Sequence, residues 1–414
     1  MNLYSFTPFA RECNERARDF ENVRQAFQPD TAGMKQQDTS HNGQPGKPDV
    51  RTMKRHGNLF DKIASFENLL AAEKAALRSK RRRPDPAAFH FDLEPNLFEL
   101  HDELQSGTYR PGEYRSFWIR DPKRRLISAA PYRDRVVHHA VCRVVEPIFD
   151  RSMIFDSYAN RMAKGTHKAL NRATEFCRRW PYVLKCDVEK FFPSIDHEIL
   201  LALVARKIKC KPTLELIGRI VRASNPQEPV PGYFPGDDLF TPQERRRGIP
   251  IGNLTSQFLA NVMLDPMDHF IKEGLRWPAY VRFADDFLLF ADEKPLLHRV
   301  LPVLREFLEG YRLRLHPRKC VVLPVRWGVP FLGWRLYPDH RRLRRSTGVR
   351  FQRRLRELAA AYGRGEAELA DVRASVASWI GHLKHGNTWG LRRKLLYGAA
   401  FRRVCPSITR EDCS

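Results

Sequence analysis

Apolar and polar residues follow two spacings along this chain, one typical of helices and one of strands, and together they predict an α+β fold. Apolar residues at helical spacing begin near residue 59, and further helices are expected at 134–149, 196–208, 212–224, 256–274 and 296–310. Short runs rich in Val, Phe and Tyr predict strands at 114–119, 125–129, 182–186, 321–323 and 331–334. A last segment, 348–404, is expected to be wholly helical and is very basic.

The beginning of the chain differs in composition from the rest. Residues 28–50 are mostly Gln, Asp, Gly, Pro, Ser and Thr, and such a segment can bury too little apolar surface to fold. Residues 1–53 are therefore expected to form a disordered N-terminal extension. Met53 is a candidate for the true start of the protein.

Two adjacent carboxylates, Asp285 and Asp286, lie between apolar runs at 280–283 and 287–290. Charged groups cannot lie in an apolar core unless a partner neutralises them. The pattern predicts a β-hairpin with both Asp residues at its turn, at the rim of a cleft. A divalent metal ion suits oxygen ligands in that arrangement, and a solvated turn is the alternative.

A third carboxylate, Asp187, follows the predicted strand 182–186. If this strand and the hairpin are neighbours in one sheet, the three carboxylates supply what a site for two Mg²⁺ ions needs. One ion would activate a primer 3′-hydroxyl, and the other would hold a triphosphate and its leaving pyrophosphate. Catalysis would then consist mainly of positioning and charge neutralisation.

Between these acids, the segment 248–257 carries two glycines, Gly248 and Gly252, before a predicted helix. Glycine lets a backbone approach a nucleotide closely. The other interpretation is structural, with Thr255 or Ser256 serving as an ordinary helix cap.

The net charge of the chain limits the classes of partner that it is expected to bind. It has 414 residues, with 72 Lys and Arg against 48 Asp and Glu, and a formal net charge of +24. A protein this basic usually meets a polyanion, and nucleic acid is favoured over a ribosomal or membrane-surface role. No apolar run approaches the roughly 20 residues of a membrane span, so no membrane partner is expected. The eight scattered cysteines fit reduced thiols in a cytoplasm.

The order of these motifs resembles the palm of reverse transcriptases. Asp187 with Phe192, the loop 248–252, Phe283-Ala284-Asp285-Asp286, Lys319 and Phe331-Leu332-Gly333-Trp334 follow one another over most of the chain. The resemblance implies an α+β right-hand polymerase with fingers, an antiparallel-sheet palm and a helical thumb. The expected division is a disordered extension at 1–53, fingers and the start of the palm at 54–180, the palm with its catalytic motifs at 181–338, and a basic helical thumb at 339–414.

Within that family, Ile251 followed by Gly-x-x-x-Ser-Gln is similar to reverse transcriptases of diversity-generating retroelements, as are the segments 55–63 and 378–382. The aliphatic residue at this position goes with low fidelity in that branch. Reverse transcriptases of antiviral defence, retron or group II-like systems share parts of the pattern and remain the alternative. Phe283 departs from the Tyr of most relatives, and the missing hydroxyl removes one hydrogen-bonding group near the primer end.

The resemblance also implies residue roles. Asp187, Asp285 and Asp286 would be catalytic and hold two Mg²⁺ ions, which Mn²⁺ could replace. Phe192 would exclude a ribose 2′-hydroxyl, and Lys319 would lie near the leaving phosphates as a general acid, with a simple exposed lysine as the alternative. Nucleotide contacts are implied for Lys123, Arg125, Phe192, Ile251, Gly252 and Lys319, and primer or template contacts for Phe283, Gln257, Phe331, Leu332, Gly333 and Trp334.

The implied partners are a template RNA, its cDNA product in an RNA–DNA hybrid, and deoxynucleoside triphosphates. The diversity-generating branch adds a small basic accessory protein. Two rival functions are an RNA-dependent RNA polymerase, which Ala284 and Phe192 disfavour, and a non-catalytic RNA-binding protein, which the complete set of carboxylates disfavours. Trp379 and Trp389 are expected to be core residues of the thumb.

Overall fold

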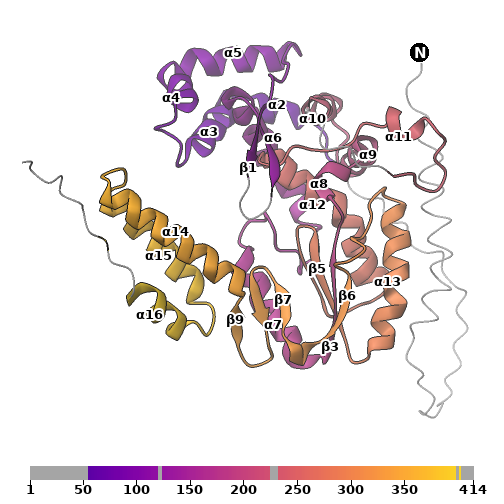
Figure 1. The fold of residues 1–414 in the computed structure, drawn as a ribbon. Coiled ribbons are helices and arrows are strands. Elements are labelled where there is room, and N and C mark those ends of the chain that lie inside the picture. Colours follow the sequence, from indigo (N-terminus) through magenta and orange to yellow (C-terminus); the bar gives the residue numbers. More distant parts are fainter. Residues whose placement is uncertain (1–54, 120–123, 224–231, 398–400, 402–414) are drawn as a thin grey trace, which may run out of the picture.

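The computed structural model describes residues 55–119, 124–223, 232–397 and 401. Three groups of elements are arranged in space: helices at the top of Figure 1, a central sheet with helices on both faces, and a separate helical arm on the left. The expected extension at 1–53 lies outside the described residues. No helix in the described part of the chain is both long and apolar enough to cross a membrane.

The upper group is built around one long helix, α6, which contacts three of the short helices and also α12. Its inward positions, among them Val136, Val137 and Val141, are buried. Pro147 lies inside it without ending it. The elements of this group are α2 (Phe60–Ala64), α3 (Phe66–Leu77), α4 (Pro84–Phe91), α5 (Leu93–Gln105) and α6 (Tyr132–Asp150).

A two-stranded antiparallel hairpin extends from this group. It consists of β1 (Arg115–Ile119) and β2 (Arg125–Ala129), with Arg115 opposite Ala129 and Ile119 opposite Arg125. Every residue of β1 is exposed, whereas β2 turns Ser128 inward. The hairpin predicted from the sequence is confirmed in the described residues.

The central sheet is wholly antiparallel, with strand order β4-β5-β3-β6. The alternation of residues along its strands assigns its two faces to two different hydrophobic cores. On β5, Phe287 and Leu289 belong to the core shared with α13, whereas Leu288 and Phe290 belong to the core shared with α7. The bounds are β3 (Tyr182–Asp187), β4 (Tyr280–Phe283), β5 (Asp286–Ala291), β6 (Val321–Pro324), α7 (Thr166–Arg179) and α13 (Lys294–Glu309).

Helices between β3 and β4 connect the sheet to the upper group. The expected helix at 256–274 is present, and its last turn is a π-helix instead of an α-helix. The alternative that Thr255 or Ser256 caps this helix is wrong, because both are buried inside it and Asn253 precedes it. The elements are α8 (Phe191–Ser194), α9 (His197–Lys207), α10 (Lys211–Arg222), α11 (Thr241–Glu244), α12 (Leu254–His269) and η1 (Phe270–Gly274).

A second antiparallel sheet, β7-β8-β9, joins the centre to the helical arm. It follows the short 3₁₀ helix η2 (Val325–Trp327) and contains β7 (Val329–Phe331), β8 (Trp334–Leu336) and β9 (Arg341–Leu343). The predicted strand at 331–334 is wrong, because Leu332 and Gly333 form the turn, with φ of 46° and 84°. Because β9 pairs with β8, the expected thumb boundary at residue 339 falls inside this sheet.

The arm consists of α14 (Arg345–Gly363), α15 (Leu369–Leu383) and α16 (Trp389–Tyr397). The expected helical end is present in the described residues, but it is not wholly helical, because turns at 364–368 and 384–388 separate its helices. Trp379 is a core residue, since its ring stacks on that of Phe351 at a centroid distance of 3.7 Å. The same prediction for Trp389 is wrong, because 66% of that residue is exposed.

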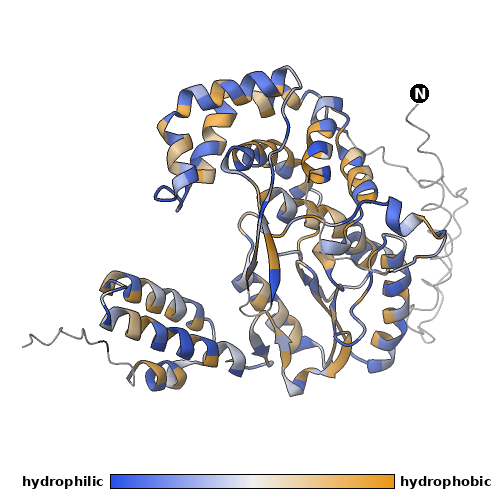
Figure 2. Cartoon of the chain, turned by 45° about the horizontal axis from the view of Figure 1, so that its top comes forward, coloured by the Kyte–Doolittle hydropathy of each residue, from blue (hydrophilic) through white to orange (hydrophobic). Residues whose placement is uncertain are grey.

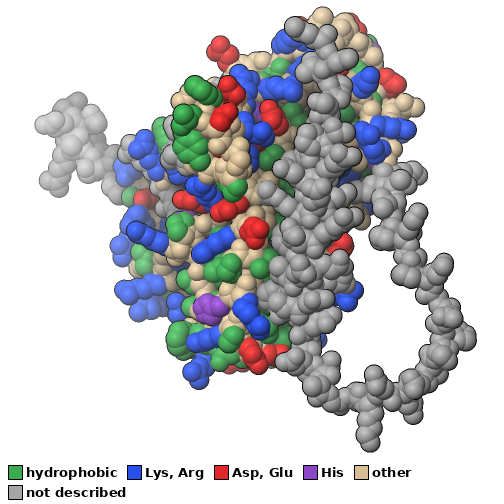
Figure 3. Space-filling view, turned by 90° about the vertical axis from the view of Figure 1, so that its right-hand side faces the viewer, with side chains coloured by type: hydrophobic (Ala, Val, Ile, Leu, Met, Phe, Trp, Pro, Cys, Tyr) green, Lys and Arg blue, Asp and Glu red, His purple; other side chains and the backbone are tan. Residues whose placement is uncertain are grey.

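Hydrophobic and hydrophilic residues alternate around these helices (Figure 2). Lys and Arg side chains are spread over the face drawn in Figure 3, with fewer Asp and Glu among them. On α14, Arg353, Arg354 and Arg356 are exposed. The excess of positive charge is therefore carried on the surface, where a polyanion can reach it.

Candidate active site

The three candidate carboxylates lie at one end of two paired strands. Asp187, the last residue of β3, is directly opposite Asp286, the first residue of β5. Asp285 lies in the turn between β4 and β5, where its carbonyl oxygen accepts a hydrogen bond of 3.2 Å from the backbone N–H of Val188. The prediction that the two acidic segments are neighbours in one sheet is therefore confirmed.

Two of the three carboxylates are each paired with a lysine. Nζ of Lys185 donates to Oδ1 of Asp286 at 2.6 Å, and Nζ of Lys319 donates to Oδ1 of Asp187 at 2.8 Å. Lys185 lies opposite Leu288, so its contact with Asp286 is a diagonal pair on one face of the sheet. A lysine within an otherwise apolar strand was the signal that could have revealed this partner.

The carboxylates do not converge on a single point. Across the described ranges, no group of three His, Cys, Asp or Glu side chains is arranged to hold a metal ion. The two ion pairs explain this arrangement physically, because Asp187 and Asp286 are each turned toward an ammonium group. A metal ion would have to compete with these lysines for the same oxygen atoms.

The electrostatics of the group nevertheless favour a cation. Burial, together with the charges of Asp187 and Asp286, raises the pKa of the Asp285 carboxyl to about 6, against the opposing charge of Arg125. Burial also raises the pKa of Asp286, and Lys185 opposes that rise. Hard carboxylate oxygens that repel one another are the donor set that Mg²⁺ prefers, so these residues fit such an ion in chemistry.

A buried ion pair supports the turn from behind. The guanidinium of Arg282 on β4 donates to both carboxylate oxygens of Asp268 on α12, at 2.7 and 2.5 Å. It also donates to the carbonyl oxygen of Ala284 at 3.1 Å, within the turn itself. Sequence reasoning missed this support, although an arginine in an apolar strand requires a buried partner.

The glycine loop docks on the hairpin of the upper group. The backbone N–H of Ser128 donates to the carbonyl oxygen of Ile251 at 3.3 Å, and the Asn253 side chain bonds to the carbonyl of Ser128 at 3.1 Å. Gly252 has a φ of 117°, and a Cβ there would lie 3.1 Å from Cγ2 of Ile127. Glycine is therefore favoured here by its backbone conformation, and the close approach of β2 adds to that preference.

The other predicted nucleotide contacts are placed as follows. Arg125 is an exposed residue of β2, and its positive charge acts to lower the pKa of the Asp285 carboxyl. Phe192 is half-buried at the start of α8, whereas Phe191 beside it is buried in the core. The carbonyl oxygen of Phe192 accepts from the backbone N–H of Ile249 at 3.0 Å. Lys123 lies outside the described residues.

The predicted primer and template residues divide into two groups. Phe283, Gln257 and the turn residues Leu332 and Gly333 are half-buried. The side chains of Phe331 and Trp334 are buried in the core, because the β-hairpin turns both of them away from its accessible tip. Of the four residues predicted at this hairpin, only Leu332 and Gly333 of the turn are therefore partly accessible.

The segment between the upper group and the sheet is held by local contacts. Nε of Arg161 donates to Asp150 at 2.5 Å, and its Nη1 donates to the carbonyl oxygens of Ile154 and Ser157. His167, at the start of α7, stacks on His385 at a ring-centroid distance of 3.5 Å. The contact between His167 and His385 joins the helical arm to the centre.

Comparison with known proteins identifies related sequences. The family profile described as "Reverse transcriptase (RNA-dependent DNA polymerase)" matches residues 120–336. The chain is 27% identical over 286 residues to Protein YkfC of Escherichia coli (strain K12), covering 59% of this chain and 72% of that protein. It is 25% identical over 181 residues to the group II intron-encoded protein LtrA of Lactococcus lactis subsp. cremoris, covering 43% of this chain and 28% of that protein.

Other matches are partial or distant. The chain spans 20% of the length of a putative COX1/OXI3 intron 1 protein of Saccharomyces cerevisiae, with 25% identity over 179 residues. Among solved structures, apo telomerase from Candida tropicalis matches 69% of this chain and 60% of its own, at 12% identity and a TM-score of 0.44. The chain thus spans less than a third of the intron-related proteins named here.

Proposed function

Because the chain belongs to the reverse transcriptase family, whose profile covers residues 120–336, we propose that Asp187, Asp285 and Asp286 are its catalytic, metal-binding residues. The chain is an RNA-directed DNA polymerase with the right-hand fold. Its upper helices and hairpin are the fingers, its central sheet is the palm, and its helical arm is the thumb. The observation that carries the residue assignment is the register of the palm, which sets Asp187 directly opposite Asp286.

The proposed cofactor is a pair of Mg²⁺ ions, replaceable by Mn²⁺, which when bound would activate the primer 3′-hydroxyl and neutralise the triphosphate. Neighbouring residues of the chain position the carboxylates that would bind these ions. In the absence of a metal ion, Lys185 holds Asp286 in position and Lys319 holds Asp187. Arg282 fixes the backbone of the turn that positions Asp285. Preorganised charges of this kind are the main contribution that a polymerase protein makes to catalysis.

We propose that Lys319 binds the phosphates that leave during polymerisation and donates a proton to them. Its ammonium group is within hydrogen-bonding distance of Asp187, which supports this role over that of a simple exposed lysine. Arg125 would bind the incoming triphosphate from the fingers, as would Lys123. A general acid in such a position contributes roughly 10²- to 10⁴-fold to rate in other enzymes.

Nucleotide selection is assigned to Phe192, Ile251 and Gly252. The half-buried ring of Phe192 would fill the space of a ribose 2′-hydroxyl and so exclude ribonucleotides. Ile251 and Gly252 lie on a loop that is hydrogen-bonded to the fingers strand β2, where a templating base pair would pass. An aliphatic side chain at 251 cannot donate hydrogen bonds to the pair, which supports low fidelity.

The biological role that we propose is error-prone copying of a template RNA in a diversity-generating retroelement. The sequence pattern at 251–257 supports it. The alternative is a group II-like, retron or antiviral system, and the intron-encoded relatives favour that alternative. The proposed partners are a template RNA, the RNA–DNA hybrid on the basic thumb, deoxynucleoside triphosphates and, for the first role, a small basic accessory protein.

Two measurements test these proposals. Asp187→Asn and Asp285→Asn should each abolish Mg²⁺-dependent incorporation of deoxynucleotides on an RNA template. Retained incorporation would overturn the assignment, whereas RNA binding without any incorporation by the unaltered chain would support a non-catalytic RNA-binding role. Sequencing the cDNA made on a defined template separates the biological roles: errors concentrated at template adenines support diversity generation, and faithful copying supports the alternative.

A further inference from the structure

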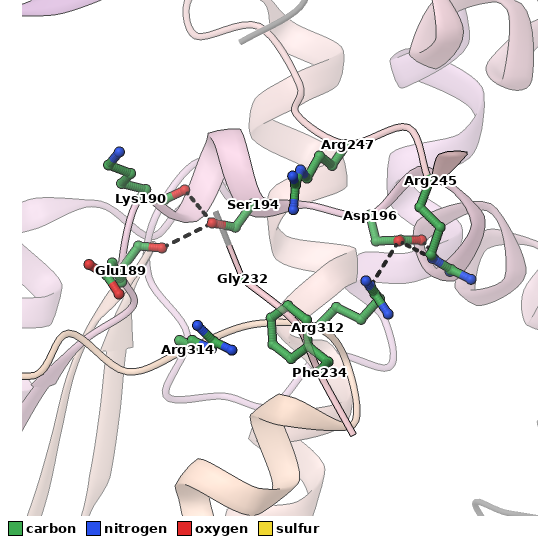
Figure 4. Close-up of a pocket in the computed structure, with 10 residues that line it drawn as sticks. All are labelled: Glu189, Lys190, Ser194, Asp196, Gly232, Phe234, Arg245, Arg247, Arg312 and Arg314. Carbon is green, nitrogen blue, oxygen red and sulfur yellow. Dashed lines mark hydrogen bonds and ion pairs between the residues drawn. The ribbon is translucent and has the colours of Figure 1, made fainter. Parts of the chain in front are cut away.

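A partly enclosed pocket with a volume of about 130 Å³ is lined by segments that adjoin the proposed catalytic residues in the sequence (Figure 4). This is roughly ten times the space that a single water molecule requires. Five of its lining side chains are basic, namely Lys190, Arg245, Arg247, Arg312 and Arg314, and two are acidic, Glu189 and Asp196. The pocket is therefore a concentration of positive charge.

The walls of the pocket continue directly into the candidate active site. Lys190 follows Asp187 by three residues, Arg247 immediately precedes the loop 248–252, and Arg314 precedes Lys319 by five residues. Hydrogen bonds join these walls: the backbone N–H of Glu189 donates to the carbonyl of Arg314 at 2.7 Å. A ligand in the pocket would thus contact the segments that position the catalytic carboxylate, the glycine loop and Lys319.

Two of the arginines are already neutralised by carboxylates. Arg245 makes a bidentate contact with Asp196, with distances of 2.7 and 2.8 Å, and a further ion pair with Glu198 at 2.9 Å. Arg312 forms a bidentate contact with Asp237. These pairs build the floor of the pocket and leave little charge for a ligand.

The other two arginines have no carboxylate partner among the described residues. The guanidinium of Arg314 lies over the ring of Phe234, at 4.6 Å from its centroid, and donates to the carbonyl of Tyr233. Arg247 donates to the carbonyl of Pro242 at 3.4 Å. A Cβ at Gly232 would lie 2.8 Å from Nη1 of Arg314, so a larger residue there would displace this guanidinium from its present position. In Figure 4, Arg247 and Arg314 extend toward the same space from different segments.

We propose that this pocket binds the diphosphate group of a small phosphate compound. Each guanidinium presents a planar set of donors that matches phosphate oxygens, and two such groups on different walls suit two linked phosphates. The enclosed form of the pocket favours a small anion over a nucleic-acid strand. The ligand's source rests on the proposed function: it is either the pyrophosphate released by polymerisation or the phosphates of a nucleoside triphosphate.

Isothermal titration of the full chain with pyrophosphate, in a chelator and without template, tests the proposal. The chelator removes metal-dependent binding at the catalytic group, whose bare carboxylates repel pyrophosphate, and the arginine variants then show how much of the remaining binding belongs to the pocket. Saturable binding is expected, and the double variant Arg247→Gln/Arg314→Gln should weaken it at least about tenfold. Arg326→Gln, at an exposed position outside the pocket, is the matched control and should leave the affinity unchanged.

The outcomes are distinct. Absence of saturable binding, or binding that is unchanged in a double variant with the parent melting temperature, overturns the proposal. If the double variant does not fold, Arg247→Lys/Arg314→Lys replaces it; retained charge without the planar donors should weaken binding, and an unchanged affinity overturns the two-guanidinium site. Displacement of pyrophosphate by a short RNA at lower concentration than by nucleotide also overturns it.

Two further arms identify the ligand's source and separate the proposals. Pyrophosphate that binds more tightly than a deoxynucleoside triphosphate identifies the released product, and the reverse order identifies the intact nucleotide. Primer extension is measured on the same preparations. Extension without pyrophosphate binding refutes the pocket alone, and pyrophosphate binding without extension refutes the polymerase assignment alone.

Discussion

The ammonium group of Lys319 lies 2.8 Å from Oδ1 of Asp187, at the last residue of β3. A cation from the chain therefore shares the carboxylate that is proposed to bind metal. Its position has two consequences: the lysine is near enough to act on leaving phosphates, and it competes with a metal ion for an oxygen ligand.

Replacement of Lys319 should separate these two consequences. In Lys319→Ala we expect kcat to fall at least roughly tenfold, because a positioned acid is lost. The Mg²⁺ concentration for half-maximal activity should fall as well, because Asp187 loses its competing cation. Primer extension over a Mg²⁺ titration measures both, with the exposed Lys62→Ala as control. An unchanged Mg²⁺ requirement would count against competition at Asp187.

The raised pKa of Asp285 predicts a pH-dependent stability in the absence of metal. Its pKa is about 6 in the folded protein and 3.8 in the unfolded chain, so the folded state holds the extra proton between these values. The stability that this proton contributes is present below pH 3.8 and is lost as pH rises through about 6. The full loss amounts to about 3 kcal/mol, at 1.36 kcal/mol for each pH unit.

Denaturant unfolding of the unaltered chain and of Asp285→Asn, both in a chelator, measures this effect. The variant cannot ionise at this position, so its stability relative to the unaltered chain should increase as the pH is raised from 4 to 7. A constant difference across that range would show that Asp285 is not held in an unfavourable charged state.

The buried pair of Arg282 and Asp268 should be essential to stability as a pair. Arg282→Met leaves the Asp268 carboxylate buried without its main partner, and a loss of about 3–5 kcal/mol in unfolding free energy is expected. The double variant Arg282→Met/Asp268→Leu should lose less than the single one, because no uncompensated charge remains. Equal or greater loss in the double variant would mean that the two residues do not depend on each other.

Phe192 and its neighbour Phe191 provide a matched test of nucleotide selection. Phe192→Ala should raise incorporation of ribonucleotides relative to deoxynucleotides at least about tenfold, a change of roughly 1.4 kcal/mol in discrimination. Phe191→Ala should instead destabilise the protein by about 3–5 kcal/mol without this change, since its ring is in the core. Competition between the two nucleotide types in primer extension gives the ratio for each variant.

Local features of the active site were readable from the sequence. The Asp285-Asp286 hairpin was predicted because two short apolar runs of strand type flank a polar pair, and Asp187 because it directly follows another such run. Both signals depend on neighbours along the chain. The sequence did not predict that Phe331 and Trp334 are buried while the two residues between them form a turn. Four consecutive residues of this kind fit a strand as well as the tip of a hairpin.

Trp389 illustrates the same limit in the thumb. An aromatic residue in an amphipathic helix is usually packed, as Trp379 is against Phe351, but Trp389 is exposed at the start of α16. Which face of a helix is covered depends on which other helix lies against it. That information belongs to the packing of the arm and not to the pattern of one helix.

The sequence by itself determined the α+β class, most helices and strands, and the order of the proposed catalytic motifs, because spacing and turn composition act over a few residues. Only the tertiary structure decided that Asp187 lies opposite Asp286, that Lys185 and Lys319 neutralise them, that Arg282 supports the turn from α12, and that four arginines surround one pocket. The physical reason is that these contacts join segments far apart in the chain. Their geometry follows from strand register and from the burial of charges, which must find partners wherever the fold places them.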